Sequence, residues 1–247
     1  MKGAGVIRRL FFTAKLPKFV KIFHFWPLCW FSTQNTTIFL DFCVKFAYIC
    51  SMSFTEPHIV NLGEIASLSV GYPFRNTCVP GESGTLACFL RDIDDSGELN
   101  LQNLKRVEDA NPNDSHIAKE NDVVFRSRGT PFMASVVPEI AEDLLVVAPM
   151  IRIRVNREMI LPEYLVWYIN SAYGAAYFKE FATGSGIPLV SKGVLEQMSI
   201  KLPSLNAQQA IADLVELGRK EQEILAEIVR QKNLILETEI SKYLESL

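Results

Sequence analysis

The alternation of apolar and polar positions divides the chain into a strand-rich region and one long terminal helix. Between residues 59 and 205, short apolar runs are separated by turn residues, a pattern typical of strands joined by turns. Strands are predicted at residues 85–90, 122–128, 132–137, 144–147, 150–155 and 198–202. Helices are predicted at residues 163–170, where Pro162 suits the first turn, and at residues 173–181. The combination predicts an α/β (α+β) domain with a mixed, twisted sheet.

The end of the chain predicts a single long helix, because no proline follows Pro203. The helix is expected to begin near Asn206 as N-cap, with Gln209 three positions on as its capping-box partner. Its length, more than about 50 Å by helical rise, exceeds the size of a domain of about 150 residues. This length favours a partner helix, and complete packing against the helix's own domain is the alternative.

A heptad-like seam runs along the second half of this helix. Apolar residues recur every seven positions, which is typical of a coiled coil, although Gly218 and Lys232 fall where an ideal seam would be apolar. The candidate helix-interface residues are Ile228, Val229, Ile235, Leu236 and Tyr243. The seam predicts a homodimer through the C-terminal helix.

The first 51 residues differ from the rest in composition. They hold seven Lys/Arg and one acidic residue, Asp41, together with nine of the 16 Phe and three of the five Cys. A membrane anchor is one interpretation, but Pro27 and a polar run at 32–37 interrupt the uncharged stretch. An added interaction arm is another. The favoured interpretation is a misplaced start, in which the native protein begins at Met52, with a domain at 52–205 and the helix at 206–247.

Catalytic and metal-binding motifs are absent from the sequence. It contains no G-x-G-x-x-G, P-loop, H-E-x-x-H or G-x-S-x-G. The five cysteines form no C-x-x-C pair and no Cys/His spacing that suits zinc, which predicts a reducing, cytoplasmic compartment and no metal. His116 is more typical of an ordinary surface or core histidine than of a catalytic one. The sequence therefore predicts a protein that is not an enzyme.

The order of several short motifs resembles one known family. The motifs are Asn61-Leu-Gly-Glu-Ile-Ala66, Gly71-Tyr-Pro-Phe74, Arg91-Asp-Ile93, the segment 121–129, Gly174-Ala-Ala-Tyr-Phe178, Gly184-Ser-Gly-Ile-Pro188, and Leu202-Pro203-Ser-Leu205 followed by Gln208-Gln209-Ala-Ile211. Together they resemble the specificity subunit of type I restriction-modification systems over about residues 58 to 247. Members usually carry two target-recognition domains and two long helices, whereas this chain has one of each.

The resemblance implies a non-catalytic subunit that reads one half of a bipartite double-stranded DNA target. It also implies docking to a methyltransferase subunit, which would bring S-adenosylmethionine, and through it to an ATP-using restriction/translocase subunit. No cofactor is expected in this chain and no membrane is implied. Two copies would read a symmetric target, since half-site spacing follows protein symmetry.

DNA contacts would have to arise locally, because residues 52–205 hold 13 basic and 19 acidic residues and lack a basic footprint. Alternation along a strand predicts that Arg126 and Arg128 share one face, as do Arg152 and Arg154, with apolar residues on the reverse. Such faces suit contact with DNA, and a solvated strand edge is the alternative.

Two loops add candidate donors, since serine hydroxyls and backbone amides suit phosphate oxygens. They contain Ser127 and Ser185, and the glycines around Ser185 are equally typical of a tight turn. Weaker candidates are Tyr72, Arg75 and Lys192. A rival hypothesis is an interaction scaffold, or truncated remnant, that binds methyltransferase through its helix and no longer reads DNA.

Overall fold

The computed structural model describes residues 58–74, 80–81, 83–108, 110–184 and 186–246. The interpretation of residues 1–51, with a start at Met52, lies outside these residues. A compact unit of residues 47–247 contains all the described elements.

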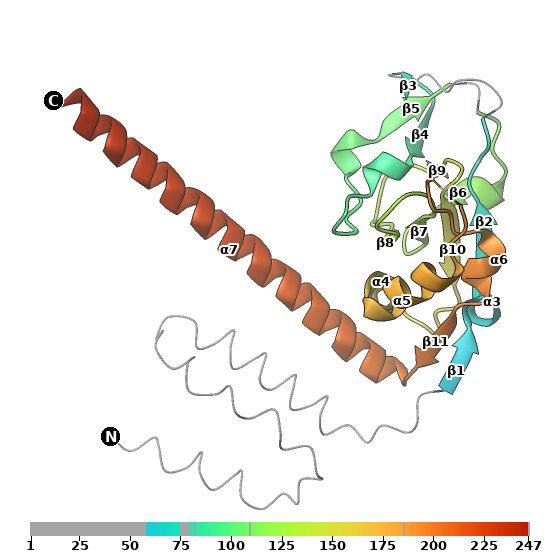
Figure 1. Ribbon diagram of the computed structural model, residues 1–247. Helices are drawn as coiled ribbons and strands as arrows, with labels where there is room; N and C mark the ends of the chain where they lie inside the picture. The colour runs from blue at the N-terminus through green and yellow to red at the C-terminus, as the bar shows by residue number, and fades with distance from the viewer. Residues whose placement is uncertain (1–57, 75–79, 82, 109, 185, 247) are drawn as a thin grey trace, which may run out of the picture. The chain divides into compact units, whose positions relative to one another are not determined.

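The strands form three sheets (Figure 1). A two-stranded sheet pairs β1 (His58–Asn61) with β11 (Ser199–Leu202). A four-stranded sheet has the order β2 (Ala66–Val70), β10 (Ile151–Val155), β7 (Val123–Arg126), β8 (Met133–Val136). A five-stranded sheet has the order β3 (Pro80–Gly81), β5 (Lys105–Val107), β4 (Thr85–Cys88), β9 (Leu144–Val146), β6 (Ile117–Ala118). Among the described strand pairs, β4 and β9 run parallel and the others antiparallel.

The helices follow the pattern read from the sequence. They are α3 (Leu62–Ile65), α4 (Pro162–Asn170), α5 (Ala172–Phe181), α6 (Lys192–Glu196) and α7 (Leu205–Glu245). Short 3-10 turns occur at Leu90–Asp92, Leu101–Asn103 and Asp114–His116. The mixed α/β class and the long C-terminal helix are confirmed, and each predicted strand and helix has a counterpart within a few residues.

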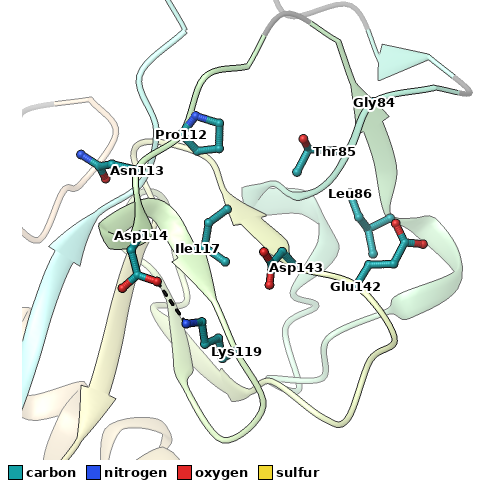
Figure 2. Close-up of a pocket in the computed structure, with 10 residues that line it drawn as sticks. All are labelled: Gly84, Thr85, Leu86, Pro112, Asn113, Asp114, Ile117, Lys119, Glu142 and Asp143. Carbon is teal, nitrogen blue, oxygen red and sulfur yellow. Dashed lines mark ion pairs between the residues drawn. The ribbon is translucent and has the colours of Figure 1, made fainter.

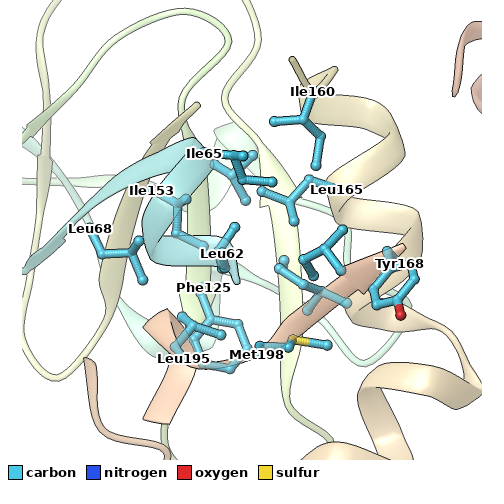
Figure 3. Packing of buried hydrophobic residues seen from close by; sticks show 14 of the residues in the cluster. Leu62, Ile65, Leu68, Phe125, Ile153, Ile160, Leu165, Tyr168, Leu195 and Met198 are labelled. Carbon is cyan, nitrogen blue, oxygen red and sulfur yellow. The ribbon is translucent and has the colours of Figure 1, made fainter. Parts of the chain in front are cut away.

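One face of the four-stranded sheet packs against the helices. Phe125 and Ile153 point from β7 and β10 into a cluster that Leu62, Leu165 and Leu195 close from α3, α4 and α6, as Figure 3 shows. All five side chains are fully buried. This cluster is the main core of the domain.

The opposite face of the same sheet is buried as well, against the five-stranded sheet. Val124 from β7 packs there with Cys88 of β4, Val146 of β9 and Met150. Burial raises the pKa of the Cys88 thiol far above its ordinary value, so this cysteine behaves as a small apolar side chain. The central sheet is therefore enclosed on both sides, and any polar group on it needs a partner inside the protein.

The first turns of α7 are fixed to the domain by a buried glutamine. Gln208 has no exposed surface, and its amide nitrogen donates to the Met159 and Pro203 carbonyls at 2.9 Å each. Its amide oxygen accepts a hydrogen bond from the Leu161 backbone N–H at 2.9 Å. Because α7 also packs on α4, this end of the helix belongs to the domain.

The N-cap differs from the one expected. The Ser204 hydroxyl, and not the Asn206 side chain, accepts a hydrogen bond from the Ala207 backbone N–H at 3.4 Å. The predicted pair of Asn206 and Gln209 is wrong because the cap lies two residues earlier, at Ser204, and the helix begins at Leu205. Gln209 instead bonds Asp213 one turn later, at 2.9 Å. Serine is as good a cap as asparagine, so composition alone did not separate the two.

The second part of α7 is exposed: every residue from Arg219 to Ser246 is accessible to solvent in the single chain. The exposed side chains include the five candidate interface residues, which are 44–66% accessible. In the described part of the chain, no helix is long and apolar enough to cross a membrane.

Replacing Gln208 with leucine should lower the free energy of unfolding by about 1–3 kcal/mol, because buried backbone groups would lose their partners. Urea unfolding followed by circular dichroism measures the change. The matched control is Gln209→Leu, on the exposed side of the same turn, which should stay within about 0.5 kcal/mol of the unmodified chain. Equal effects of the two substitutions would contradict the anchoring role of Gln208.

Candidate nucleic-acid interface

The candidate arginines of β7 and β10 lie on one face of the four-stranded sheet. Arg152 pairs across the strands with Val124, so the two side chains share a face. Val124 belongs to the cluster beneath the five-stranded sheet, and Arg126 follows it by two positions. Arg126, Arg152 and Arg154 therefore lie on a single face, directed toward the second sheet, whereas Arg128 lies past the end of β7.

Arg152 and Arg154 are bound to the protein's own chain. Arg154 Nε and Nη2 donate to the two carboxylate oxygens of Asp122, at 2.8 and 2.7 Å. Arg152 is 4% exposed, lies 3.9 Å from the same carboxylate, and donates to the Ile117 carbonyl at 3.2 Å. Asp122 itself is 3% exposed and accepts a further bond from the Lys119 backbone N–H. This network ties the central sheet to the segment before β7.

The electrostatics of the pair follow from burial and from Asp122. Burial is the largest influence on Arg152 and lowers the pKa of its guanidinium. The hydrogen bonds from Arg154 to Asp122 raise the pKa of Arg154. The prediction that these two arginines bind DNA stays untested, but in this structure their donors are directed at protein oxygens.

Arg126 is also held within the domain. Its guanidinium donates to the Ile93 carbonyl at 3.0 Å, to the Pro131 carbonyl at 2.6 and 3.1 Å, and to Asp95 at 2.7 Å. Its side chain is 12% exposed, whereas that of Asp95 is 77% exposed. Its role in DNA contact remains a prediction, and any such contact would compete with these bonds.

Arg128 differs from the other three arginines because it is exposed. Among the described residues its side chain has no hydrogen-bond or ion-pair partner, while its backbone forms an isolated bridge with Leu189. The neighbouring Ser127 is 1% exposed and donates its hydroxyl to the Pro149 carbonyl at 2.6 Å. The pair is thus divided: Ser127 is an internal support, and Arg128 lies at the surface.

The two loops singled out from the sequence lie side by side. The Gly129 backbone N–H donates to the Pro188 carbonyl at 2.9 Å, and the Val190 N–H donates to the Ser127 carbonyl at 2.9 Å. Gly129 and Gly184 have φ angles of +87° and +112°, a conformation that favours glycine. The tight-turn interpretation of Gly184 is therefore correct, and the turn brings its loop beside Arg128. We call residues 128–131 and 183–189 the paired loops; Ser185, within them, lies outside the described residues.

A pocket of about 400 Å³ adjoins the paired loops. Its lining combines the apolar side chains of Phe132, Ile169 and Phe178 with the charged Lys179 of α5. Lys179 and Phe132 were missed from the sequence because they lie about 50 residues apart, and no periodic signal joins them.

The remaining candidates lie elsewhere. Tyr72 packs edge-on against Phe74 and His116, with ring centroids 5.0 and 5.3 Å away, so it is part of a small aromatic cluster. Lys192 opens α6 and forms an i,i+4 ion pair with Glu196 at 3.4 Å. Arg75 falls outside the described residues. Among the described residues, no recorded side-chain contact joins Tyr72 or Lys192 to the paired loops.

A larger pocket, of about 590 Å³, lies at the edge of the five-stranded sheet (Figure 2). Its charged lining residues are Asp114, Glu142, Asp143 and Lys119, and Lys119 pairs with Asp114 at 3.1 Å. The excess of carboxylates makes it unsuitable for a phosphate backbone. Across the described residues, no group of three or more His, Cys, Asp or Glu side chains has an arrangement that could hold a metal ion.

A family model matches this chain, and the match agrees with both the fold and the order of the sequence motifs. The model for the type I restriction modification DNA specificity domain matches residues 96–230, more than half of the chain. The chain belongs to this family, as the motif order indicated. A comparison with curated proteins gives no match.

Solved structures show the same fold at low sequence identity. The HsdS subunit from Thermoanaerobacter tengcongensis aligns with a TM-score of 0.52 and 19% identity, over 74% of this chain and 48% of that one. A chain from a structure concerning complex assembly and conformational transition of the type I R-M system aligns with a TM-score of 0.51 and 17% identity. That alignment covers 79% of this chain and 49% of the other. This chain thus spans about half the length of the structures that it matches.

Replacing Asp122 with alanine should lower the free energy of unfolding by about 3–5 kcal/mol, because it leaves Arg152 buried without its counter-charge. Chemical denaturation measures the loss. The control is Asp114→Ala, which removes an exposed partner of Arg154 and Lys119 and should leave the free energy of unfolding nearly unchanged. If the two variants are equally stable, the buried network is not what holds this face of the sheet.

Proposed function

We propose that the chain is a DNA sequence-recognition subunit of a type I restriction-modification complex, reading one half of a bipartite target. The observation that carries the proposal is the pairing of two loops around an exposed arginine in a chain of the specificity family. A loop that is held by backbone hydrogen bonds and presents an exposed guanidinium suits base reading, because arginine pairs with guanine O6 and N7 in the major groove.

The division of labour within the domain supports this proposal. Arg152 and Arg154 stabilise the central sheet through Asp122, and Arg126 holds the turn at residues 93–95. These internal bonds fix β7, the strand that leads to Arg128. A contact residue supported by rigid strands loses less entropy on binding than one on a mobile loop.

The exposed part of α7 is proposed to pair with a second copy of the chain. Val229, Leu236 and Tyr243 are 57–66% exposed in one chain, and a seam of this kind is stable in water only when it is covered. We place these residues at the d positions of the heptads, so that Ala226, Asn233 and Ile240 are the intervening core positions. In this register Lys232 lies on the flank of the seam, and the candidates Ile228 and Ile235 lie outside its core. The seam is long enough for a two-helix interface.

The charges beside the seam favour an antiparallel pair. Arg230 and Glu237 lie on one flank, and Lys232 and Glu239 lie on the other. In an antiparallel pair like flanks meet, so Arg230 faces Glu237 and Lys232 faces Glu239 of the second copy, which pairs all four charges. In a parallel pair opposite flanks meet, and only Lys232 and Glu237 are paired. The antiparallel arrangement also separates the two recognition domains along the helices, as a split target requires.

The wider assembly is proposed from the family. A methyltransferase subunit would dock on this chain and supply S-adenosylmethionine, and a restriction/translocase subunit would supply the ATP-driven step. The chain itself would be non-catalytic and cytoplasmic. An interaction scaffold that no longer reads DNA is the second candidate, favoured by the excess of acidic residues in 52–205 and by the internal bonds of three of the four arginines.

Replacing Arg128 with alanine should weaken binding to the cognate half-site by about 1–3 kcal/mol if the side chain contacts a base, and should relax discrimination there. A phosphate contact would instead weaken binding to all sequences alike and flatten the salt dependence. Titrations with cognate and scrambled duplexes at two salt concentrations separate these results. Arg157→Ala, an exposed arginine beyond β10, is the matched control and should matter less. Unchanged binding by the Arg128 variant would make the scaffold the better hypothesis.

Replacing Leu236 with glutamate should dissociate the proposed dimer, because a charge would be buried in the seam. Sedimentation velocity measures the subunit mass, and circular dichroism checks that the domain remains folded. Leu234→Glu is the control: this leucine is 51% exposed and lies on the other side of the helix, so the dimer should persist. A monomeric unmodified chain, alone and with methyltransferase, would refute helix pairing.

A further inference from the structure

The long helix has two attachments to the domain, and the second is distant from the first. Gln208 anchors the base of α7, as described above. Eleven residues later, Arg219 Nη1 donates to Glu98 Oε1 at 2.8 Å, across 121 positions of sequence. Eleven residues are close to three helical turns, so both side chains leave the same side of the helix, about 16 Å apart along its axis.

The turn that presents Glu98 is tightly built. The Asp94 carboxylate accepts hydrogen bonds from the backbone N–H groups of Ser96 and Glu98 at 2.8 and 2.9 Å. Gly97 has a φ of +86°, and a Cβ at that position would lie 2.5 Å from the Asn170 side-chain nitrogen at the end of α4. Asn170 in turn exchanges two hydrogen bonds with the backbone of Ala134 in β8. Glu98 therefore projects from a turn fixed to both α4 and the central sheet.

Arg219 is oriented from its own helix. Glu216 accepts from Arg219 Nε at 2.9 Å and from Nη2 at 3.0 Å, and Glu223 binds the same guanidinium from the next turn. The bonds from Arg219 are the largest of the influences that lower the pKa of Glu216 to about 2. Because the guanidinium is already oriented, little side-chain entropy is lost when it reaches Glu98.

The ion pair between Arg219 and Glu98 lies about 16 Å along the helix from Gln208. At that distance it affects the angle between α7 and the domain more than it affects the free energy of unfolding. An exposed ion pair contributes little to the free energy of unfolding, and both side chains are about half exposed. Beyond the pivot at Gln208, however, α7 continues for roughly 55 Å at 1.5 Å per residue. A swing of about 10° would move its far end by about 10 Å, the rise of on the order of three base pairs.

We propose that Glu98 and Arg219 are positioning residues that set the angle at which α7 leaves the recognition domain. In a dimer of the chain, that angle would set the separation of the two recognition domains and therefore the spacing of the half-sites. This consequence rests on the dimer described under the proposed function. The same turn binds Arg126 through Asp95 and the Ile93 carbonyl, so the attachment of the helix and the strand leading to Arg128 share one support.

The test measures the angle directly in the full-length chain. Genetically encoded spin labels at Glu120 and Gln231, both exposed, report the distance between domain and helix by pulsed electron resonance. Labelled chain is diluted with an excess of unlabelled chain, so that only distances within one chain contribute. The result therefore does not depend on whether the chain dimerises or binds DNA.

The unmodified chain should give one narrow distance distribution. Glu98→Lys and Arg219→Glu should each broaden it or shift it by about 5 Å or more, the displacement that a swing of about 10° gives at Gln231. The double variant, which restores opposite charges, should give a narrower distribution than either single variant. Raising the salt concentration from about 0.1 to 1 M should broaden the distribution of the unmodified chain, because the Debye length falls to about 3 Å.

Two controls separate the angle from other effects. Glu139→Lys makes the same charge change at an exposed loop position and should leave the distribution unchanged. The helical circular dichroism signal should be equal in all variants, which excludes fraying of α7 as the cause. Single variants with the same distribution as the unmodified chain, or a double variant as broad as the singles, would overturn the proposal. If the unmodified chain neither dimerises nor binds DNA while the variants change the distance distribution as expected, only the proposed function is contradicted.

Discussion

The central four-stranded sheet is buried on both faces, and this constraint determines what its polar side chains do. Helices cover one face and the five-stranded sheet covers the other. A charged side chain between two sheets needs a counter-charge and hydrogen-bond partners, since an isolated buried charge is strongly unfavourable. Asp122 meets this need for Arg152 and Arg154, and Asp95 together with the Ile93 and Pro131 carbonyls does so for Arg126. Three arginines that alternate along strands thus become part of the framework.

The surface available for recognition begins where the strands end. Arg128 lies just past β7, where the chain turns through Gly129 and meets the loop from α5. Its backbone forms a bridge with Leu189 of that loop, while its side chain stays exposed. A binding residue on a loop that a rigid scaffold positions is a common arrangement in proteins, because loops reach the partner and strands keep the geometry. An acidic domain can present one local basic contact in this way.

The helix α7 shows how one apolar stripe can serve two surfaces. Near its start the stripe packs on α4 and is fixed by Gln208, whereas beyond Arg219 it is exposed. The two parts have different energetic roles. The first contributes to the stability of the domain, and the second is available for association. The ion pair between Arg219 and Glu98 lies at the boundary between them.

The sequence by itself determined the elements and the family. Alternating apolar positions located the strands, the absence of proline after Pro203 gave the long helix, and the order of short motifs identified the specificity family. These properties are local, so hydrophobic period and turn chemistry are sufficient to reveal them. Tertiary structure decided which arginines are exposed, because Asp122 lies about 30 residues from Arg152 and Arg154, and Ile93 lies 33 residues from Arg126. It also selected Ser204 over Asn206 as the cap and joined Arg219 to Glu98, since such pairings depend on how distant segments pack and not on any periodicity within one segment.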